Sequence, residues 1–574
     1  MYKALAAAVC AALLAPEFAT AVNAEKFVNG EFSRQWSIDG FSTPIETDES
    51  GYVDLRAFVD GKPSSDKYLT CRGTFTAPSD GLMLMGAGAD WWFDISVNGA
   101  PVFSIMDTGN SDFPISIRNQ VVAIPVRTGV NEVVAVIRSG SNGCSMAIGA
   151  LPFTLENYAK IDRRQRISQL FPPSTTVLRQ PLAIRPGSAN CSFSFGTDGD
   201  VPSGVQWRKK GDKEWNTTWE LFLGQVAANR TDHIVTVDGL EPDTEYELRV
   251  VMVDQDKWTE VYSPEISVFR TLPTAGAAFR FFVTADTQLN ARELRPLLDG
   301  LANNCELEDC GFVMHLGDLD NRFSYQELTD ALLPLARFGT KMVPVVQARG
   351  NHEYRGVERS DFAKFFVTDG KTYYTFQAGD AFFIVLDSGE DTGRRPGSYA
   401  FNFPEQMLAE EKLWLAEVIE SPEFKNAKFR IVVSHGAPED GCGQLMAGNM
   451  RNMTDEFFAG ENPKAQIHLW LSGHIHRYMR TIPGAAKFLS PNDRSENIMS
   501  AVYRPYTIAA VSGPDDRDTR ISGFNVTVSG DELKVDAVTP GGELLDAFTI
   551  RPDGTIESRP GSRLRTLGPD AAEK

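Results

Sequence analysis

Five short clusters in the second half of the sequence carry side chains that could bind metal ions. The clusters are Asp286-Thr287-Gln288, Gly317-Asp318, Gly350-Asn351-His352-Glu353, His435-Gly436 and Gly473-His474-Ile475-His476. The chain has seven histidines, and four of them lie in these clusters. A pair of hydrolytic metal ions needs carboxylate and amide oxygens, neutral imidazoles, and an open position for water and substrate. The clusters therefore predict the two-metal site of a hydrolase.

Asp318 is the natural bridge between the two ions, because a carboxylate can offer one oxygen to each. Taken alone, Asp318 could cap a helix and Asn351 could be a turn residue, so the prediction depends on the complete ordered set. The other ligands divide into two shells: Asp286, Gln288 and His476 for one ion, and Asn351, His435 and His474 for the other.

Each cluster follows an apolar, β-branched or aromatic run that predicts a buried strand. The five runs are Phe279 to Ala285, Gly311 to Leu316, Met342 to Gln347, Phe429 to Ser434 and Ile467 to Ser472. Amphipathic helices are predicted between several of them, at 291–301, 325–338 and 405–419. Open α/β sheets bind ligands at the carboxyl ends of their strands, so this β-α-β order places the clusters where a site is expected.

In this order the motifs resemble those of the calcineurin-like metallophosphoesterases, and among these the purple acid phosphatases and their bacterial relatives. The family pattern is D-x-H or D-x-G, G-D, G-N-H-E/D, a later H and G-H-x-H, and this chain matches it over roughly Ala278 to Ile550. The resemblance implies a ββ sandwich flanked by helices. It also implies that His352 acts as the acid or transition-state stabiliser, and that the metal ligands include Asp286, Asp318, Asn351, His435, His474 and His476.

Two positions depart from the family pattern. The first motif usually ends in histidine, but this chain has Gln288, whose amide oxygen is a weaker and harder ligand than imidazole. Purple acid phosphatases carry an iron-ligating tyrosine three residues after the bridging aspartate, and here that residue is Asn321. We therefore expect no purple colour. The expected cofactors are two divalent or trivalent metal ions, with Fe, Mn and Zn all admissible.

The resemblance implies an acid phosphatase-like enzyme that hydrolyses phosphomonoesters by in-line attack of a metal-bound hydroxide. A phosphodiesterase or nucleotide hydrolase would use the same residues and is the first alternative. A glycan-binding surface protein with a vestigial site, and an exported structural protein with a closed stabilising metal, are further alternatives. Arg355, Arg394 and Arg395 could steer a phosphate, although loop arginines are usually solvated, and the segment Leu386 to Asp391 could line the cleft.

The amino terminus has the features of a secretory signal peptide over residues 1–24. Lys3 precedes an apolar run from Ala4 to Ala15, and Val22-Asn23-Ala24 offers a small-residue cleavage site. We expect a secreted or periplasmic protein without stable membrane insertion, since the run is too short to span a bilayer. The formal net charge of −20 argues against nucleic acid as a partner, and a small phosphoester is the expected one. The oligomeric state is left open.

Removal of residues 1–24 would leave six cysteines in an oxidising compartment. Cys191 is expected to be a buried thiol, and Cys442 follows the His435 motif without an obvious mate. Two disulfides are expected, Cys71 with Cys144 and Cys305 with Cys310.

Two all-β domains are predicted before the catalytic domain. Residues 25–155 resemble a galactose-binding-like jelly roll, with a hairpin from Trp91 to Ile105 around Asn98-Gly99. We interpret Trp91 and Trp92 as core residues, with stacking on a glycan as the alternative. Residues 170–273 resemble a fibronectin type III-like domain, similar to the amino-terminal domain of purple acid phosphatases, in which Tyr246 can cap a sheet corner.

The catalytic domain is predicted at 277–552 and a flexible tail at 553–574. His315 and His468 fall inside apolar strands and are expected to be packed core residues rather than ligands.

Overall fold

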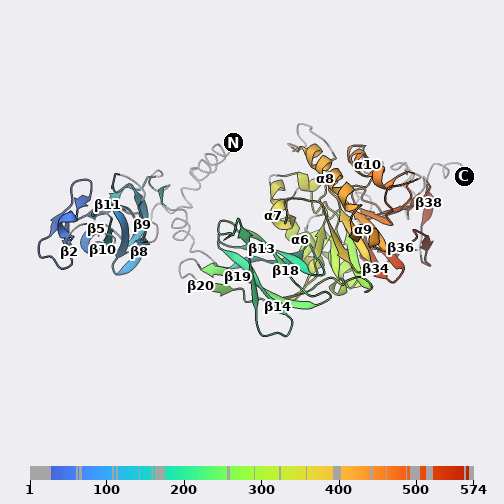
Figure 1. The fold of residues 1–574 in the computed structure, drawn as a ribbon, viewed down its shortest axis with the longest axis horizontal. Coiled ribbons are helices and arrows are strands. Elements are labelled where there is room, and N and C mark those ends of the chain that lie inside the picture. Colours follow the sequence, from blue (N-terminus) through green and yellow to red (C-terminus); the bar gives the residue numbers. More distant parts are fainter. Residues whose placement is uncertain are drawn as a thin grey trace. The chain divides into compact units, whose positions relative to one another are not determined.

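The computed structural model describes most of the chain between residues 27 and 567. The residues not described are 1–26, 60–62, 64–66, 107–108, 111–113, 141–142, 155–156, 158–159, 162–174, 255–258, 290, 322, 324, 357, 392–401, 440–443, 461, 486–487, 491–503, 512, 514–520, 562–563 and 568–574. The predicted signal peptide, Arg394, Arg395 and Cys442 thus lie outside the described residues. Two compact units, Met1–Pro173 and Ser174–Lys574, are described separately (Figure 1).

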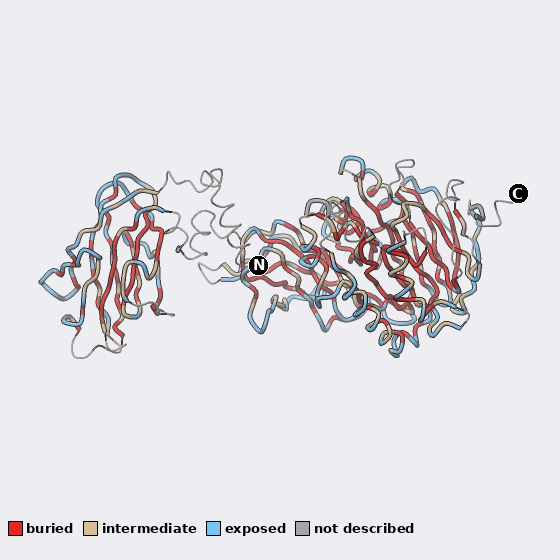
Figure 2. Tube along the Cα trace, turned by 90° about the horizontal axis from the view of Figure 1, so that it is seen from above, coloured by how far each residue is buried: buried red, intermediate tan, exposed pale blue. Residues whose placement is uncertain are grey.

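The first unit consists of two antiparallel sheets that share one core. Its larger sheet contains β1 (Glu31–Phe32), β2 (Gln35–Ile38), β3 (Ile45–Glu46), β5 (Tyr68–Ala77), β7 (Trp91–Val97), β8 (Ala100–Ser104) and β10 (Gly129–Ser139). The smaller contains β4 (Tyr52–Asp54), β6 (Gly81–Ala89), β9 (Gln120–Val126) and β11 (Ser145–Leu151). Phe75 and Phe93 from the first sheet pack with Met85 and Ile124 from the second. Strands β5, β7 and β10 of the larger sheet alternate buried and more exposed residues, whereas β6 and β11 of the smaller sheet are buried over most of their length. Figure 2 shows the buried positions in red.

The predicted hairpin is confirmed as β7 and β8, but the interpretation of both tryptophans as core residues is wrong. Phe93 and Ile95 point into the core of the sandwich, so Trp92, one position out of phase, lies on the outer face and is only half-buried. Trp91 has the inward phase but stands at the very start of the strand, and it is 37% exposed. The Arg138 guanidinium lies 4.4 Å from the centroid of the Trp92 ring.

The second unit begins with a smaller β-sandwich whose sheets continue into the catalytic region. Its strands are β12 (Val177–Ile184), β13 (Asn190–Thr197), β14 (Ser203–Lys209), β15 (Asn216–Trp219), β16 (Leu221–Phe222), β17 (Gln225–Val226), β18 (Asp232–Asp238), β19 (Glu245–Asp254), β20 (Thr259–Tyr262) and β21 (Ser267–Arg270). Strand β12 pairs with β26 (Val345–Gln347) at Ile184 and Val345, and β21 pairs with β25 (Lys341–Met342). These shared sheets explain why residues 174–574 form one compact unit.

Two sheets face each other in the catalytic region. One continues through β22 (Phe279–Thr284), β23 (Phe312–His315), β26, β34 (Gly523–Ser529), β35 (Glu532–Val538), β36 (Leu544–Ile550) and β37 (Ile556–Ser558). The other contains β27 (Tyr374–Ala378), β28 (Ala381–Val385), β29 (Phe429–Val433), β30 (Leu469–Ser472), β31 (Met479–Thr481), β32 (Phe488–Ser490), β33 (Thr507–Ala510) and β38 (Arg565–Leu567). Phe281 and Phe312 of the first sheet pack edge-on against Phe383 of the second, with ring centroids 5.4 and 5.6 Å away.

Helices cover the outer faces of both sheets (Figure 1). Helices α5 (Ala291–Asn304) and α6 (Tyr325–Ala336) pack on the first sheet through Leu298 and Leu332, and α8 (Pro404–Val418) and α10 (Gln444–Phe458) pack on the second. The remaining helices are α7 (Phe362–Phe366) and α9 (Pro422–Asn426), with 3-10 turns η2 (Arg56–Phe58), η3 (Leu307–Asp309), η4 (His352–Tyr354) and η5 (Arg359–Asp361). The predicted sandwich of two sheets flanked by helices is confirmed. Among the described residues, no helix has the length and apolar character needed to cross a membrane.

Two sequence predictions fail in the described part of the chain. The tail at 553–574 is not wholly flexible, because β37 pairs with β36 and β38 pairs with β32. The expected disulfides are absent, since the five described cysteines are all free and buried. They serve as small apolar packing residues, and burial raises the pKa of the Cys305 thiol to about 12. Cys191 is the buried thiol expected from its strand.

Candidate metal centre

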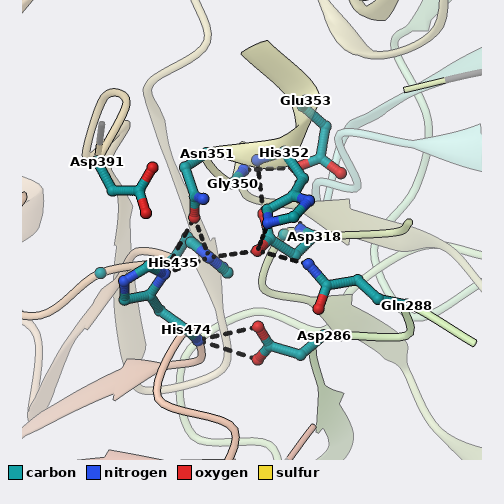
Figure 3. Close-up of polar contacts among 12 residues, drawn as sticks. Asp286, Gln288, Asp318, Gly350, Asn351, His352, Glu353, Asp391, His435 and His474 are labelled. Carbon is teal, nitrogen blue, oxygen red and sulfur yellow. Dashed lines mark hydrogen bonds and ion pairs between the residues drawn. The ribbon is translucent and has the colours of Figure 1, made fainter. Parts of the chain in front are cut away.

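All five clusters lie in loops that directly follow strands of the two facing sheets. Asp286, Asp318 and Asn351 come after β22, β23 and β26, which are neighbouring parallel strands of the first sheet. His435 and His474 come after β29 and β30, neighbouring parallel strands of the second. Because the sheets share a core, the two sets of loops meet at one edge, and Figure 3 shows their side chains pointing toward one another.

The backbone of these loops is unusual at the residues that carry the predicted ligands. Nine non-glycine residues in the described part of the chain have positive φ, and four of them are Asp286, Asp318, His474 and His476, with φ between 53 and 70°. Such conformations cost roughly 1–3 kcal/mol each and cluster at functional sites. The motif glycines make room for close approach, since a Cβ at Gly350 would lie 2.3 Å from Asp318 Oδ1. The positive φ values and the close approach of the loops direct the side chains of these residues toward one point.

Asp318 stands at the centre of the arrangement. It belongs to two groups of ligand atoms that each lie within 4.8 Å of one another, one with His435 and His474 and the other with Asp286 and His476. Its carboxylate is 1% exposed, and Oδ2 lies 3.1 Å from His435 Nε2. A carboxylate shared by two groups of ligands is what a bridge between two ions requires.

The hydrogen bonds around His435 leave a position next to its Nε2 atom that a cation must occupy. Nδ1 of His435 donates to the carbonyl oxygen of Leu316 at 2.8 Å, so in the neutral ring Nε2 carries a lone pair. That atom faces Asn351 Oδ1 at 2.9 Å and His474 Nδ1 at 3.2 Å, in addition to the Asp318 carboxylate. Electron pairs converge here from four side chains, so either a proton or a metal ion must sit among them. The donor set fits a metal ion.

The electrostatics lead to the same conclusion. Burial alone would lower the pKa of His435, but the nearby carboxylates of Asp318, Asp286 and Glu353 outweigh it and raise the pKa to about 10. Burial and the adjacent His435 lower the pKa of His474 to about 4. Burial opposes ionisation of Asp318, yet its histidine neighbours hold its pKa well below the ordinary value. The carboxylates thus stabilise a positive charge at His435, while His474 is kept neutral.

Glu353 holds two of the site loops together and was not assigned a role from the sequence. Its buried carboxylate accepts the backbone N–H groups of Asp318, Leu319 and Gly350 at 2.9, 2.8 and 2.7 Å. Burial and the charge of Asp318 raise the pKa of Glu353 to about 7. The sequence signal for such a role is the place of Glu353 inside the Gly350 to Glu353 turn, directly after Asn351 and His352.

Residues 279–478 match the family model described as calcineurin-like phosphoesterase. This segment is a calcineurin-like phosphoesterase domain. It starts at β22 and extends just past His476, so it contains all five clusters. The protein is therefore a metal-dependent phosphoric ester hydrolase.

Two solved structures are similar to this chain at low sequence identity. The chain is similar to the purple acid phosphatase PPD1 from yellow lupin (Lupinus luteus) seeds, with 14% identity and a TM-score of 0.44, covering 84% of this chain and 93% of that one. It is also similar to PhoD, with 13% identity and a TM-score of 0.47, covering 68% of this chain and 94% of that one. At these TM-scores the likenesses carry no inference about fold or substrate. A comparison with curated protein sequences gives no match.

In the phosphoesterase domain, His352 and Gln288 lie beside Asp318 rather than within either group of carboxylate and imidazole ligands. His352 Nδ1 donates to the carbonyl oxygen of Asn321 at 2.9 Å, and Nε2 lies 3.7 Å from Asp318 Oδ2. Gln288 donates its amide N–H to Asp318 Oδ2 at 3.0 Å, and Figure 3 shows its amide oxygen on the side of Asp286.

The other candidate residues of the phosphoesterase domain separate into two kinds. His315 ends β23 and His468 immediately precedes β30, and both are buried, as expected for core histidines. Thr287 and the Pro552 carbonyl oxygen are among their partners. The segment 386–391 is connected to the site through Arg355, whose Nη1 lies 2.8 Å from His352 Nε2. Glu390 and Asp391 bind Arg355, a contact that the sequence does not reveal.

Proposed function

We propose that the protein is an exported phosphoesterase that hydrolyses phosphomonoesters with two metal ions. The observation that carries this proposal is the sharing of Asp318 between two groups of potential ligands. His352 is the proposed acid, because it lies next to the bridge without belonging to either group. The proposed metal ligands are Asp286, Gln288, Asp318, Asn351, His435, His474 and His476.

The chain's own residues would prepare the reaction in several ways. Two bound ions would activate a water molecule for in-line attack and neutralise charge on the phosphoryl oxygens. The Leu316 carbonyl oxygen fixes the His435 ring so that Nε2 faces Asn351 and Asp318, where it could hold an ion. The backbone N–H of His352 orients Asp318 through Oδ1 at 2.9 Å. His352 would deliver a proton from Nε2 to the leaving-group oxygen, a role worth roughly 10²- to 10⁴-fold in rate.

The metals proposed for the site are Fe, Mn or Zn. Imidazole and carboxylate ligands accept all three. Asn321 stands where the resemblance to purple acid phosphatases implies a tyrosine, and its carbonyl oxygen is engaged by His352. We therefore expect the iron-loaded protein to lack a phenolate-to-iron absorption band.

The test is to strip the protein of metal, verify its metal content, and reload it with Mn, Fe or Zn before assaying it. Matched phosphomonoester and phosphodiester substrates separate the proposed activity from a phosphodiesterase or nucleotide hydrolase using the same residues. We expect activity to vanish on stripping, to return with metal, and to favour the monoester. Full activity in verified metal-free protein would refute the two-metal proposal.

We further infer export and the identity of the two β-domains. Lys3 and the apolar run after it support a signal peptide at 1–24 and a secreted or periplasmic location. The first sandwich is proposed to be galactose-binding-like and the second fibronectin type III-like. The second proposal is supported by Tyr246, whose hydroxyl accepts the backbone N–H of Glu241 at 2.8 Å at the sheet corner. Mass spectrometry of the mature protein should find Glu25 at its amino terminus.

The first unit offers a candidate surface for a glycan. Tyr68, Arg138 and Trp92 are paired across three adjacent strands, so they form a row on the outer face of the sheet. Tyr68 is 55% exposed, and aromatic rings beside a guanidinium are suited to stacking and hydrogen bonding with a sugar. A glycan array with the full-length protein and its Trp92→Ala variant tests this, and equal binding by both proteins would exclude this surface.

A further inference from the structure

We propose that Arg355 is a positioning residue that holds the ring of His352, an inference that rests on the proposed function. Arg355 follows the Gly350 to Glu353 motif, and its side chain is 16% exposed. Its Nη1 lies 2.8 Å from His352 Nε2. On the other edge of the Arg355 guanidinium, Nε and Nη2 donate to Glu390 Oε1 at 3.1 and 3.0 Å. Nη2 also contacts Asp391.

The contacts of Arg355 favour a supporting role over direct binding of phosphate. Glu390 is 2% exposed, and a buried carboxylate with a second carboxylate beside it neutralises the guanidinium. The planar fork of arginine can reach two partners in fixed directions, which the single ammonium of lysine cannot do. Arg355 therefore links the loop after β28, which carries Glu390 and Asp391, to His352.

Both nitrogens of the His352 ring have a fixed partner. Nδ1 donates to the Asn321 carbonyl oxygen at 2.9 Å, and Nε2 accepts from Arg355. Rotation of the ring would lose both hydrogen bonds, so Nε2 is kept at the edge of the site, 3.7 Å from Asp318 Oδ2. Small displacements of a reacting group can cost about 10²-fold in rate, so this restraint matters for turnover.

The contact seen is the one expected after proton delivery. When the bond between phosphorus and the leaving group breaks, the leaving-group oxygen takes the proton from Nε2. The lone pair that remains on Nε2 can then accept the N–H of Arg355, as it does here. Before delivery Nε2 carries the proton and cannot accept from Arg355, so the ring is then held by the Nδ1 bond to the Asn321 carbonyl oxygen. Glu390 and Asp391 keep the guanidinium beside Nε2, where it makes the contact as the proton leaves.

The experiment compares Arg355→Gln with Arg359→Gln in the metal-loaded protein. Arg359 is a matched control because it lies four residues further along and donates to the Gly356 carbonyl oxygen instead of to His352. The substrates are an alkyl phosphate, whose leaving group needs a proton, and p-nitrophenyl phosphate, whose leaving group needs little help. For Arg355→Gln we expect kcat to fall roughly 10-fold or more with the alkyl ester and less than about 3-fold with the aryl ester, with KM unchanged.

A second comparison excludes a merely structural effect. In a His352→Ala background, Arg355→Gln should produce no further loss of kcat, because the ring it positions is gone. An undiminished loss in that background, or a rise in KM of equal size for both substrates, would overturn the proposal and point to phosphate binding. Glu390→Gln should also lower kcat more with the alkyl ester than with the aryl ester, but by a smaller factor than Arg355→Gln.

The contact can also be observed without activity. In metal-free protein labelled with ¹⁵N-histidine, the Nε2 resonance of His352, identified by its loss in His352→Ala, should shift in Arg355→Gln and not in Arg359→Gln. An unshifted resonance overturns the inference. If the metal-loaded wild-type protein hydrolysed neither phosphate ester, the proposed function would fail, while this measurement would still decide whether Arg355 holds the ring.

Discussion

Glu353 Oε2 accepts the backbone N–H of Asp318 at 2.9 Å and that of Gly350 at 2.7 Å, so one oxygen atom joins two of the site loops. The other oxygen, Oε1, accepts the N–H of Leu319. Asp318 is the shared carboxylate of the site, and Gly350 immediately precedes the predicted ligand Asn351. A residue that touches no ligand atom itself thereby fixes the spacing between two of the ligands.

Replacement of Glu353 by glutamine should weaken both the fold and the metal site. The amide has a single acceptor oxygen, and its NH₂ group would face at least one buried backbone N–H, which costs about 1–3 kcal/mol. We expect the free energy of unfolding of the second unit to fall by about that amount, and metal affinity to fall with it. Urea unfolding and metal titration measure the two effects. Glu308→Gln, at an exposed carboxylate, should change neither.

Asp318 and His352 should respond differently to removal of their side chains. Asp318→Ala removes the carboxylate shared by both groups of ligands, so the protein should lose both metal ions. His352→Ala should keep both ions and lose roughly 10²-fold or more in kcat, since the imidazole acts on the leaving group. Metal analysis and steady-state kinetics distinguish the two variants. Equal loss of metal from both would mean that His352 is a ligand.

The five site strands could be predicted because a parallel sheet covered on both faces needs continuous apolar runs. Phe279 to Ala285 has such a run, and the structure ends β22 at Thr284, two residues before Asp286. The helices at 291–301, 325–338 and 405–419 were predicted from their amphipathic periodicity and are confirmed. Helix α10 was not predicted, since glycine and asparagine residues within Gln444–Phe458 weaken its local preference.

Contacts between distant segments could not be predicted. Arg355 and Glu390 are 35 residues apart, and nothing in either local sequence specifies their pairing. The second sandwich joins the catalytic region through two short pairings, Ile184 with Val345 and Val268 with Lys341, which no local sequence pattern specifies. In the alternation of β7, Trp91 falls at a position that faces the core. It is exposed because the strand begins at this residue, and the sequence alone does not locate that end of the sheet.

The buried carboxyl group of Glu411 should make stability depend on pH. Burial and the nearby charge of Asp387 raise its pKa well above the ordinary value. The folded protein therefore keeps a proton that the unfolded chain loses above about pH 4.3. The contribution to stability is complete at lower pH and falls by about 1.4 kcal/mol per pH unit until the folded pKa is reached.

Glu411→Gln should remove this dependence. Glutamine keeps the acceptor for the backbone N–H of Asp387, which Glu411 Oε1 accepts at 2.8 Å, and it cannot ionise. The variant should be more stable than wild type at neutral pH and should approach it near pH 4. Urea unfolding across pH 4 to 8 measures the difference, with Glu410→Gln as the control at an exposed neighbour. A constant difference across this range would show that Glu411 does not titrate on unfolding.

Gln288 is the position where the sequence leaves the common family pattern, and its geometry permits a definite prediction. Its amide N–H holds Asp318 Oδ2 at 3.0 Å, which turns the amide oxygen toward Asp286. If that oxygen is a ligand, the first ion has one imidazole, His476, and three oxygen ligands. It should bind more weakly than the second ion and prefer a harder cation.

Replacement of Gln288 by histidine should tighten the first site for Zn, because an imidazole replaces an amide oxygen. We expect roughly a 10-fold gain in Zn affinity at that site, an unchanged fold, and a shift of preference from Mn toward Zn. Gln288→Ala should do the opposite and weaken the first ion for every metal. Titration of wild type and both variants with Mn and Zn measures these effects. If all three proteins bind the first ion with the same affinity and the same preference, Gln288 is not a ligand, and its contact with Asp318 only holds the bridging carboxylate in place.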